Sequence, residues 1–217
     1  MESKKTMSNT EYKAEKESLC YWAREAGRLG LVRCSSGNIS MRLKDGNILI
    51  SGSGTWLEKL TVDEICVIDA RGNPLNQVKV SGEWRLHLEV YKARPDAGAV
   101  LHFQSPCATA VACFAEKPNY NVIIEVPVYI GSIVHIPYLM PGSAALAETV
   151  AAVIADNNII QMENHGQVVV APGLKESIER AVFFELCCEI ITKNSNSLKT
   201  IPFEALSELK NYRRQRI

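Results

Sequence analysis

Apolar residues recur along this chain with two different spacings. Five segments place them every three or four residues, as the buried face of a helix does. These segments predict helices over residues 10–30, 81–94, 106–113, 142–157 and 174–193. Between them lie short apolar runs bounded by turn residues, which predict strands at 47–50, 65–68, 96–103, 122–126, 133–137, 159–162 and 167–170. The alternation predicts one α/β domain, a layered sheet covered by helices on both sides. Residues 1–10 are expected to form a loose arm and residues 200–217 a C-terminal tail.

The predicted helix over residues 81–94 begins with a run of functional groups. Ser81 is a capping residue and Pro95 ends the pattern. Glu83 falls in the first turn, where the positive end of the helix favours its ionised form. A first-turn acid needs no other role, so both a structural and a chemical role stay open for it. His87 follows one turn later and is interpreted as a packed or surface histidine, with a supporting contact to a metal ligand as the alternative.

Composition narrows the class of protein. The 217 residues carry 24 Lys and Arg against 24 Asp and Glu, so bulk charge gives no support for nucleic-acid binding. No apolar run reaches the roughly 20 residues of a membrane helix. Seven cysteines without a C-x-x-C spacing favour free thiols in a reducing compartment. We therefore expect a cytoplasmic protein that binds neither nucleic acid nor a membrane.

Three residues suited to binding a transition metal stand at the ends of predicted elements. Glu83 begins a helix, His102 ends a strand, and His165 sits at the tip of a predicted hairpin. Imidazole and carboxylate groups are common ligands of divalent transition metals. The three residues are far apart in sequence, so only the fold can bring them together.

A stretch of small residues, Ser51–Gly52–Ser53–Gly54–Thr55, follows the second strand of a predicted hairpin. Glycine and hydroxylated residues leave backbone N–H groups open, which suits an anion such as phosphate. A plain loop explains the same composition. No P-loop or dinucleotide-binding spacing occurs anywhere in the chain, so nucleotide binding has no support.

Four segments in order resemble those of the class II aldolase/adducin family. They are residues 35–40 (SSGNIS), 81–87 (SGEWRLH), 100–102 (VLH) and 164–166 (NHG). The likeness runs from about residue 12 to the C-terminus. It implies a single domain over residues 1–217, a three-layer α/β/α sandwich with a mixed, mostly antiparallel central sheet.

The resemblance also implies a zinc site. Enzymes of this family hold Zn²⁺ with three histidines beside a glutamate, and the matching positions are Glu83, His102, His165 and Gln104. Gln104 stands where the third histidine is expected. An amide oxygen is a weaker zinc ligand than imidazole. Gln104 then ligates poorly, or Glu83 completes the ligand set, or the site is metal-poor and inactive.

Further roles follow from the resemblance alone. The family's phosphate-binding positions fall on Gly37, Asn38, Ser53, Gly54, Ser81 and Gly82. Glu83 is the expected catalytic acid and base. Tyr212 matches a C-terminal tyrosine that works near the aldehyde, whereas a second family tyrosine falls near Ile124 and Glu125 and has no counterpart here.

The implied activity is the reversible, metal-dependent aldol cleavage of a ketose 1-phosphate by a homotetramer. The expected reaction converts L-fuculose 1-phosphate to dihydroxyacetone phosphate and L-lactaldehyde. Two alternatives stay open. Pentulose-phosphate epimerases and dehydratases share this scaffold. A non-catalytic, adducin-like interaction module is the other alternative. It predicts loss of the ligands, and retention of Glu83, His102 and His165 argues against it.

Overall fold

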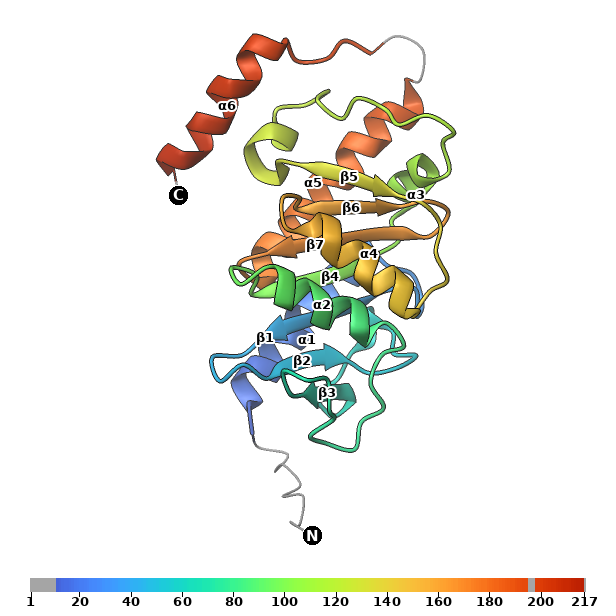
Figure 1. Cartoon of the computed structure of the whole chain (residues 1–217), viewed down its shortest axis with the longest axis vertical. Helices are drawn as coiled ribbons and strands as arrows, with labels where there is room; N and C mark the ends of the chain where they lie inside the picture. The colour runs from blue at the N-terminus through green and yellow to red at the C-terminus, as the bar shows by residue number, and fades with distance from the viewer. Residues whose placement is uncertain (1–10, 195–197, 217) are drawn as a thin grey trace.

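A seven-stranded sheet forms the centre of the molecule (Figure 1). The computed structural model describes residues 11–194 and 198–216. The spatial order of the strands is β3-β2-β1-β4-β7-β6-β5. Their bounds are β1 Asn38–Arg42, β2 Ile48–Ser51, β3 Ile65–Ile68, β4 Ala99–Phe103, β5 Ile133–Ile136, β6 Ile159–Met162 and β7 Gly166–Ala171.

Neighbouring strands in this sheet are antiparallel, with the single exception of β5 and β6, which run parallel. The prediction of a mixed, mostly antiparallel sheet is therefore confirmed. The antiparallel pairing places β1 beside β4 and β4 beside β7, although these strands are distant in sequence. Strands carrying Asn38, His102 and the hairpin of His165 thus become neighbours at the centre of the sheet.

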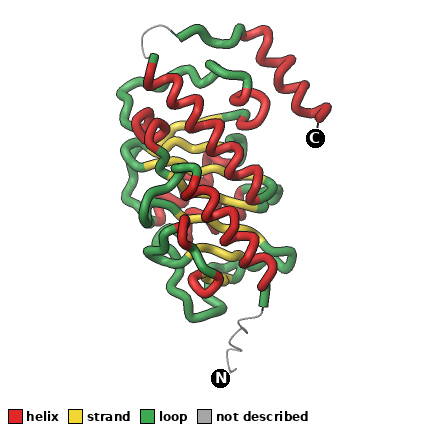
Figure 2. Tube along the Cα trace, turned by 180° about the vertical axis from the view of Figure 1, so that it is seen from behind, coloured by secondary structure: helices red, strands yellow, loops and turns green. Residues whose placement is uncertain are grey.

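Helices cover both faces of the sheet, which confirms the predicted three-layer sandwich (Figures 1 and 2). One face packs against α2 (Trp84–Ala93) and α4 (Ala144–Ile154). The opposite face packs against α1 (Lys13–Arg28), α3 (Pro106–Ala112) and α5 (Leu174–Lys193). Short 3-10 turns at Leu57–Lys59 and Val62–Glu64 precede β3. No helix in the described ranges is long and apolar enough to span a bilayer.

Burial on both faces explains why the strands read as continuous apolar runs. On β2, Leu49 enters the core under α1, whereas Ile48 and Ile50 enter the core under α2 and α4. Strand β1 departs from this pattern on one side. Asn38 and Ser40 are buried and polar. Because successive strand residues point to opposite faces, these two share a face.

Two segments differ from the sequence-based expectation. Residues 122–126 were expected to form a strand, but residues 122–124 lie in turns and bends, and a π-helical turn spans Val126–Ile130. Pro127 lacks the N–H that a strand ladder requires, so the β-branched residues before it do not extend a sheet. The expected C-terminal tail contains a helix, α6 (Phe203–Arg216), which projects from the body of the domain in Figure 1. The expected arm over residues 1–10 lies outside the described residues.

Gly98 sits where three backbone segments meet. Its N–H donates to Ala171 O at 2.9 Å, and its own carbonyl accepts from Arg42 N at 2.9 Å. A Cβ at this position would lie 1.9 Å from the carbonyl oxygen of Pro172. The sheet can therefore keep its β1–β4–β7 register only with glycine at this position.

We predict that Gly98→Ala lowers the free energy of unfolding by about 1–3 kcal/mol, the usual range for overpacking a close contact. Gly82→Ala is the matched control, because a Cβ at Gly82 meets nothing within 4 Å. Urea denaturation of both variants measures the difference. Equal midpoints for the two variants would contradict the assigned close approach.

Candidate functional site

Three elements deliver the predicted metal-binding residues to one place. Glu83 directly precedes α2, which begins three residues after Ser81, so Glu83 and not the predicted Ser81 is the capping position; the backbone N–H of Glu83 donates to the Ser81 hydroxyl at 3.3 Å. His102 lies on β4. His165 follows the tip of the β6–β7 hairpin, where Asn164 adopts a left-handed backbone conformation with φ of 53°. Asparagine tolerates that conformation better than most residues, which explains its place at the tip.

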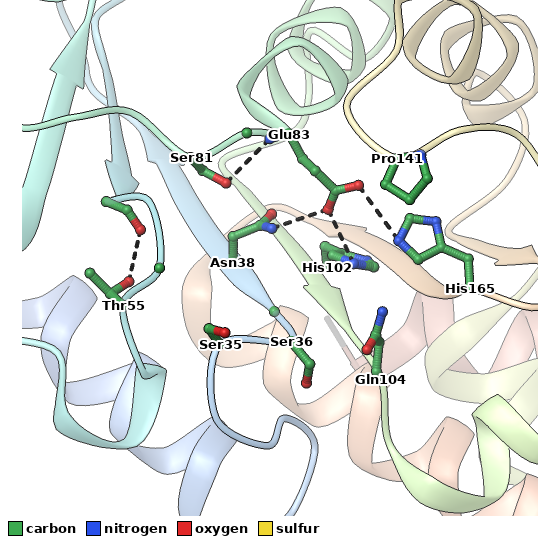
Figure 3. A pocket seen from close by; sticks show the side chains of 14 residues that line it. Ser35, Ser36, Asn38, Thr55, Ser81, Glu83, His102, Gln104, Pro141 and His165 are labelled. Atoms are coloured by element: carbon green, nitrogen blue, oxygen red, sulfur yellow. Dashed lines mark hydrogen bonds and ion pairs between the residues drawn. The ribbon is translucent and has the colours of Figure 1, made fainter.

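The side chains of Glu83, His102 and His165 converge, as Figure 3 shows. His102 Nε2 lies 3.2 Å from Glu83 Oε2, and His165 Nε2 lies 3.6 Å from Glu83 Oε1. One ligand atom from each residue lies within 4.8 Å of the other two. The three residues are mostly buried, so the cluster is shielded from bulk water.

The backbone fixes the tautomer of His102. Its Nδ1 lies 2.9 Å from the carbonyl oxygen of Gln167, which can only accept a hydrogen bond. Nδ1 therefore carries the proton, and in the neutral ring the lone pair of Nε2 points toward Glu83. Such a bond from the second nitrogen to a carbonyl is the usual way of orienting a metal-binding histidine.

The electrostatics of the cluster favour an ionised Glu83 carboxylate. Burial opposes ionisation of Glu83, but His102, the Asn38 amide and the other histidines outweigh it, so the pKa of Glu83 lies below its usual value. Burial and the neighbouring His102 lower the pKa of His165.

These residues fit a divalent metal ion. Within the described ranges, neither Glu83 Oε1 nor His165 Nδ1 has a hydrogen-bond partner, although both atoms are buried. A buried polar atom without a partner is costly, and a cation bound by Glu83 Oε1 would remove that cost at the carboxylate. Two imidazoles and a carboxylate are a suitable donor set for a divalent transition metal.

Gln104 lines the same pocket, just beyond the end of β4. Figure 3 shows its side chain extending toward His165. Its Cγ lies so near Gly166 that a Cβ on that glycine would be 2.7 Å away. Gly166 therefore leaves room for the Gln104 side chain. The predicted neighbourhood of Gln104 is found, while its role as a ligand stays a prediction.

A cleft of about 350 Å³ opens beside the cluster. Small, neutral residues dominate its walls. Among the described residues that line it, none is Lys or Arg. The lining consists of Ser35, Ser36, Gly37, Asn38, Gly52, Gly54, Thr55, Ser81, Gly82, Glu83, His102, Gln104, Pro141 and His165.

Most of the expected phosphate-binding positions face this cleft. Gly37, Asn38, Gly54, Ser81 and Gly82 line it, whereas Ser53 does not. The backbone N–H of Ser53 donates to Lys79 O at 2.9 Å, so it is not free to bind an anion. Gly52 and Thr55 of the glycine-rich stretch also line the cleft, whereas the sequence analysis assigned no role to three other lining residues: Ser35, Ser36 and Pro141. Ser35 and Ser36 adjoin the predicted position Gly37 and could have been found from their small size.

Tyr212 is not brought to the site within this chain. It lies on α6, is 45% exposed, and does not line the cleft. Its expected role beside an aldehyde stays a prediction. Pro141 reaches the cleft because Gly142 packs closely against Gly82, where a Cβ would lie 2.9 Å from the Gly82 carbonyl oxygen. No sequence pattern signals that contact between distant loops.

This chain is similar to a known protein family and to several named proteins. Residues 17–192 match the family described as Class II Aldolase and Adducin N-terminal domain. A 3-oxo-tetronate 4-phosphate decarboxylase of Haemophilus influenzae is 29% identical over 203 residues, covering 91% of this chain and 97% of that protein. The L-fuculose phosphate aldolase of Escherichia coli K12 is 32% identical over 167 residues, covering 76% and 77%.

Among solved structures, YgbL of Escherichia coli superposes with a TM-score of 0.87 at 26% identity, covering 91% of this chain and 98% of YgbL. The predicted family resemblance and the predicted fold are both confirmed. Because the family match includes the sheet, both helix layers, and the residues Glu83, His102 and His165, this chain belongs to the class II aldolase and adducin family.

Proposed function

We propose that this chain cleaves the carbon–carbon bond between the carbon beside the ketone and the next carbon of a small sugar phosphate, with Zn²⁺ as its cofactor. The first substrate to consider is L-fuculose 1-phosphate, which would yield dihydroxyacetone phosphate and L-lactaldehyde. The observation that carries the proposal is the convergence of Glu83, His102 and His165 on the edge of a cleft lined by small neutral residues. An aldolase among the relatives supports it.

Different residues of the cleft would bind the phosphate group and the reacting carbons of a substrate. Asn38, Ser81 and the glycine-rich turn at Gly54 offer amide, hydroxyl and backbone donors that suit a phosphate group. Glu83, His102 and His165 lie on the side of the reacting carbons and are the residues that would hold the metal ion. When bound, the ion would stabilise negative charge that develops on the ketone oxygen.

Glu83 is suited to move a proton in this reaction. Its Oε1 has no hydrogen-bond partner among the described residues, while its Oε2 accepts from Asn38 Nδ2 at 3.2 Å. In the aldol cleavage, the bond between the carbon beside the ketone and the following, hydroxyl-bearing carbon breaks, and a base removes the proton of that hydroxyl. That carbon becomes the aldehyde, the bonding electrons shift toward the ketone, and Glu83 returns a proton to the carbon beside the ketone.

One observation favours a second candidate, decarboxylation of a 3-oxo sugar acid phosphate. Glu83 is the only carboxylic acid among the described residues that line the cleft, and Tyr212 lies outside it. When a 3-oxo acid loses carbon dioxide, the carbon–carboxylate bond breaks and its electrons shift toward the ketone. No hydroxyl proton must leave, so one proton-transfer group is enough. A relative named for this reaction supports the candidate.

We further propose that the protein works as a homotetramer in the cytoplasm on a small-molecule sugar phosphate. The position of Tyr212 on a helix that projects from the domain supports an oligomer, since this residue can act only outside its own cleft. Sedimentation as a monomer at micromolar concentration would exclude this part of the proposal.

Purified protein separates the two reactions. With Zn²⁺ present, we expect release of dihydroxyacetone phosphate, detected with a coupled dehydrogenase. L-Fuculose 1-phosphate would give an aldehyde as the second product, whereas 3-oxo-tetronate 4-phosphate would give carbon dioxide. A panel of other ketose 1-phosphates serves as the comparison. Absence of carbon–carbon cleavage with the whole panel in a metal-loaded protein would overturn the proposed function.

We predict that the protein binds about one divalent ion per chain, with His nitrogens roughly 2.0–2.1 Å from zinc. His102→Ala and His165→Ala should each abolish stoichiometric binding, because each removes a ligand from a three-residue set. Elemental analysis after dialysis and isothermal titration measure the effect. His135→Ala is the control, since His135 bonds to Tyr120 instead. Retained binding in both ligand variants would place the metal elsewhere.

We predict that Gln104→His tightens zinc binding and leaves the fold intact. Imidazole is a stronger zinc donor than a neutral amide, and position 104 lines the cleft beside the cluster. Competition with a chromophoric chelator measures the affinity, and circular dichroism checks the fold. An unchanged or weaker affinity would show that residue 104 does not face the ion.

We predict that Glu83→Gln stops proton transfer while ligand binding survives. The amide keeps the size of the side chain but removes the base, which should slow proton exchange about 10²–10⁴-fold. The measurement is deuterium exchange from solvent into dihydroxyacetone phosphate, with its dissociation constant and the zinc content recorded in parallel. Exchange at the normal rate in the zinc-loaded variant would remove Glu83 from the mechanism. Loss of zinc would instead identify Glu83 as an essential ligand.

A further inference from the structure

Next to the site, two polar residues of α2 contact two polar residues of β1. His87 and Tyr91 are one helical turn apart on α2, and Asn38 and Ser40 are alternate residues on β1. The two spacings are similar, about 6 Å along a helix turn and about 6.6 Å along a strand. All four residues are buried, with exposures of 8% or less. The helix and the strand therefore share a polar seam inside an otherwise apolar layer.

Hydrogen bonds run along this seam without a break and reach Glu83. Tyr91 Oη lies 2.9 Å from Ser40 Oγ, and Ser40 Oγ lies 2.7 Å from His87 Nδ1. The other ring nitrogen, His87 Nε2, bonds to Asn38 Oδ1. Asn38 Nδ2 then donates to Glu83 Oε2 at 3.2 Å. The far end of the seam is thus connected to the carboxylate of the site.

The direction of each bond follows from the carboxylate. Ionised Glu83 only accepts, so Asn38 must present its NH₂ group to Glu83 and its oxygen to His87. Because that oxygen also only accepts, His87 must carry its proton on Nε2. Burial lowers the pKa of His87 to about 3, so the ring is neutral and Nδ1 accepts from the Ser40 hydroxyl. The Ser40 oxygen is then free to accept from Tyr91.

The Glu83 carboxylate and the Nε2–H tautomer of His87 together distinguish the two ends of the Asn38 amide. If the amide were reversed, its oxygen would face the Glu83 carboxylate and its NH₂ group would face the Nε2–H of His87. Both contacts would be repulsive. An apolar side chain at position 87 would leave the Asn38 oxygen buried without a hydrogen-bond partner, which is unfavourable.

We propose that His87 is a positioning residue that fixes the Asn38 amide and, through it, the Glu83 carboxylate. The Nε2–H of His87 holds the Asn38 oxygen, so that the NH₂ group holds Oε2 of Glu83. Oε1 is thereby left unpaired on the side of His165, where metal binding or proton transfer takes place. The kinetic consequence rests on the proposed function, while the tautomer and the orientation do not.

Two substitutions at position 87 separate positioning from simple packing. In His87→Gln the amide NH₂ lies near the place of Nε2–H and can still donate to Asn38, whereas His87→Leu fills the space without a donor. Loss of a residue that supports a metal ligand without binding the metal itself typically lowers metal affinity or activity about 10–100-fold. We expect a loss of about that size for His87→Leu. His87→Gln should restore most of both quantities.

His135→Leu is the matched control for a lost histidine. Like His87, His135 makes a side-chain hydrogen bond, to Tyr120 Oη at 2.7 Å, but it lies on β5 at the edge of the sheet and does not line the cleft. We expect His135→Leu to change stability without changing zinc affinity or kcat. Zinc affinity is measured by chelator competition, and kcat with the substrate that the wild-type protein cleaves.

A long-range ¹H–¹⁵N spectrum of the wild-type protein tests the tautomer directly at neutral pH. We expect the His87 ring to be neutral with its proton on Nε2, and the His87→Gln spectrum identifies its signals. A proton on Nδ1 would overturn the proposal. Wild-type zinc affinity and kcat in His87→Leu would overturn it as well, as would a loss that His87→Gln fails to restore. If the tautomer and zinc affinity behave as expected but no substrate is cleaved, the proposed function fails and the positioning role stands.

Discussion

The site depends on one electrostatic constraint, the burial of the Glu83 carboxylate beside His102 and His165. A buried anion without partners is strongly unfavourable, so each neighbouring group must compensate it. The Asn38 amide donates a hydrogen bond to one carboxylate oxygen of Glu83. Nitrogens of the two imidazoles lie 3.2 Å and 3.6 Å from the Glu83 carboxylate oxygens. Backbone hydrogen bonds hold the strands that carry these groups in register. This register places beside Glu83 the groups that offset the cost of burying its charge.

The sequence predicted the parts of this arrangement that depend on residue type and local period. The helices and most strands follow from apolar spacing, and Glu83, His102 and His165 could be named as ligands from their chemistry and the family resemblance. The strand predicted over 122–126 was wrong because β-branched residues give the same signal in a turn that precedes Pro127. The seam from His87 to Asn38 could not be predicted, since it needs the register of a helix against a strand.

The two candidate reactions differ in whether a hydroxyl proton of the substrate must be removed. Both break a bond to the carbon beside a ketone, and both leave the electron pair to be stabilised at the same place in the cleft. Residues that hold the phosphate or the metal therefore cannot distinguish them. The distinction lies in whether a second acid reaches the leaving group, and within this chain Tyr212 lies on α6, away from the cleft. Fold and ligand set thus select neither the reaction nor the substrate by themselves.

Charge balance in the cleft links substrate binding to metal binding. Among the described residues that line the cleft, Glu83 is the one ionised carboxylate, and none is Lys or Arg. A phosphate monoester brings about 1.5–2 negative charges at neutral pH, so substrate and site would repel each other if their charges stood alone. Backbone and hydroxyl donors near Gly54 and Ser81 lower this repulsion but carry no full charge. A divalent cation held by Glu83, His102 and His165 would bring the sum close to neutrality. The same ligands that equip the site for chemistry would then also allow an anionic substrate to enter it.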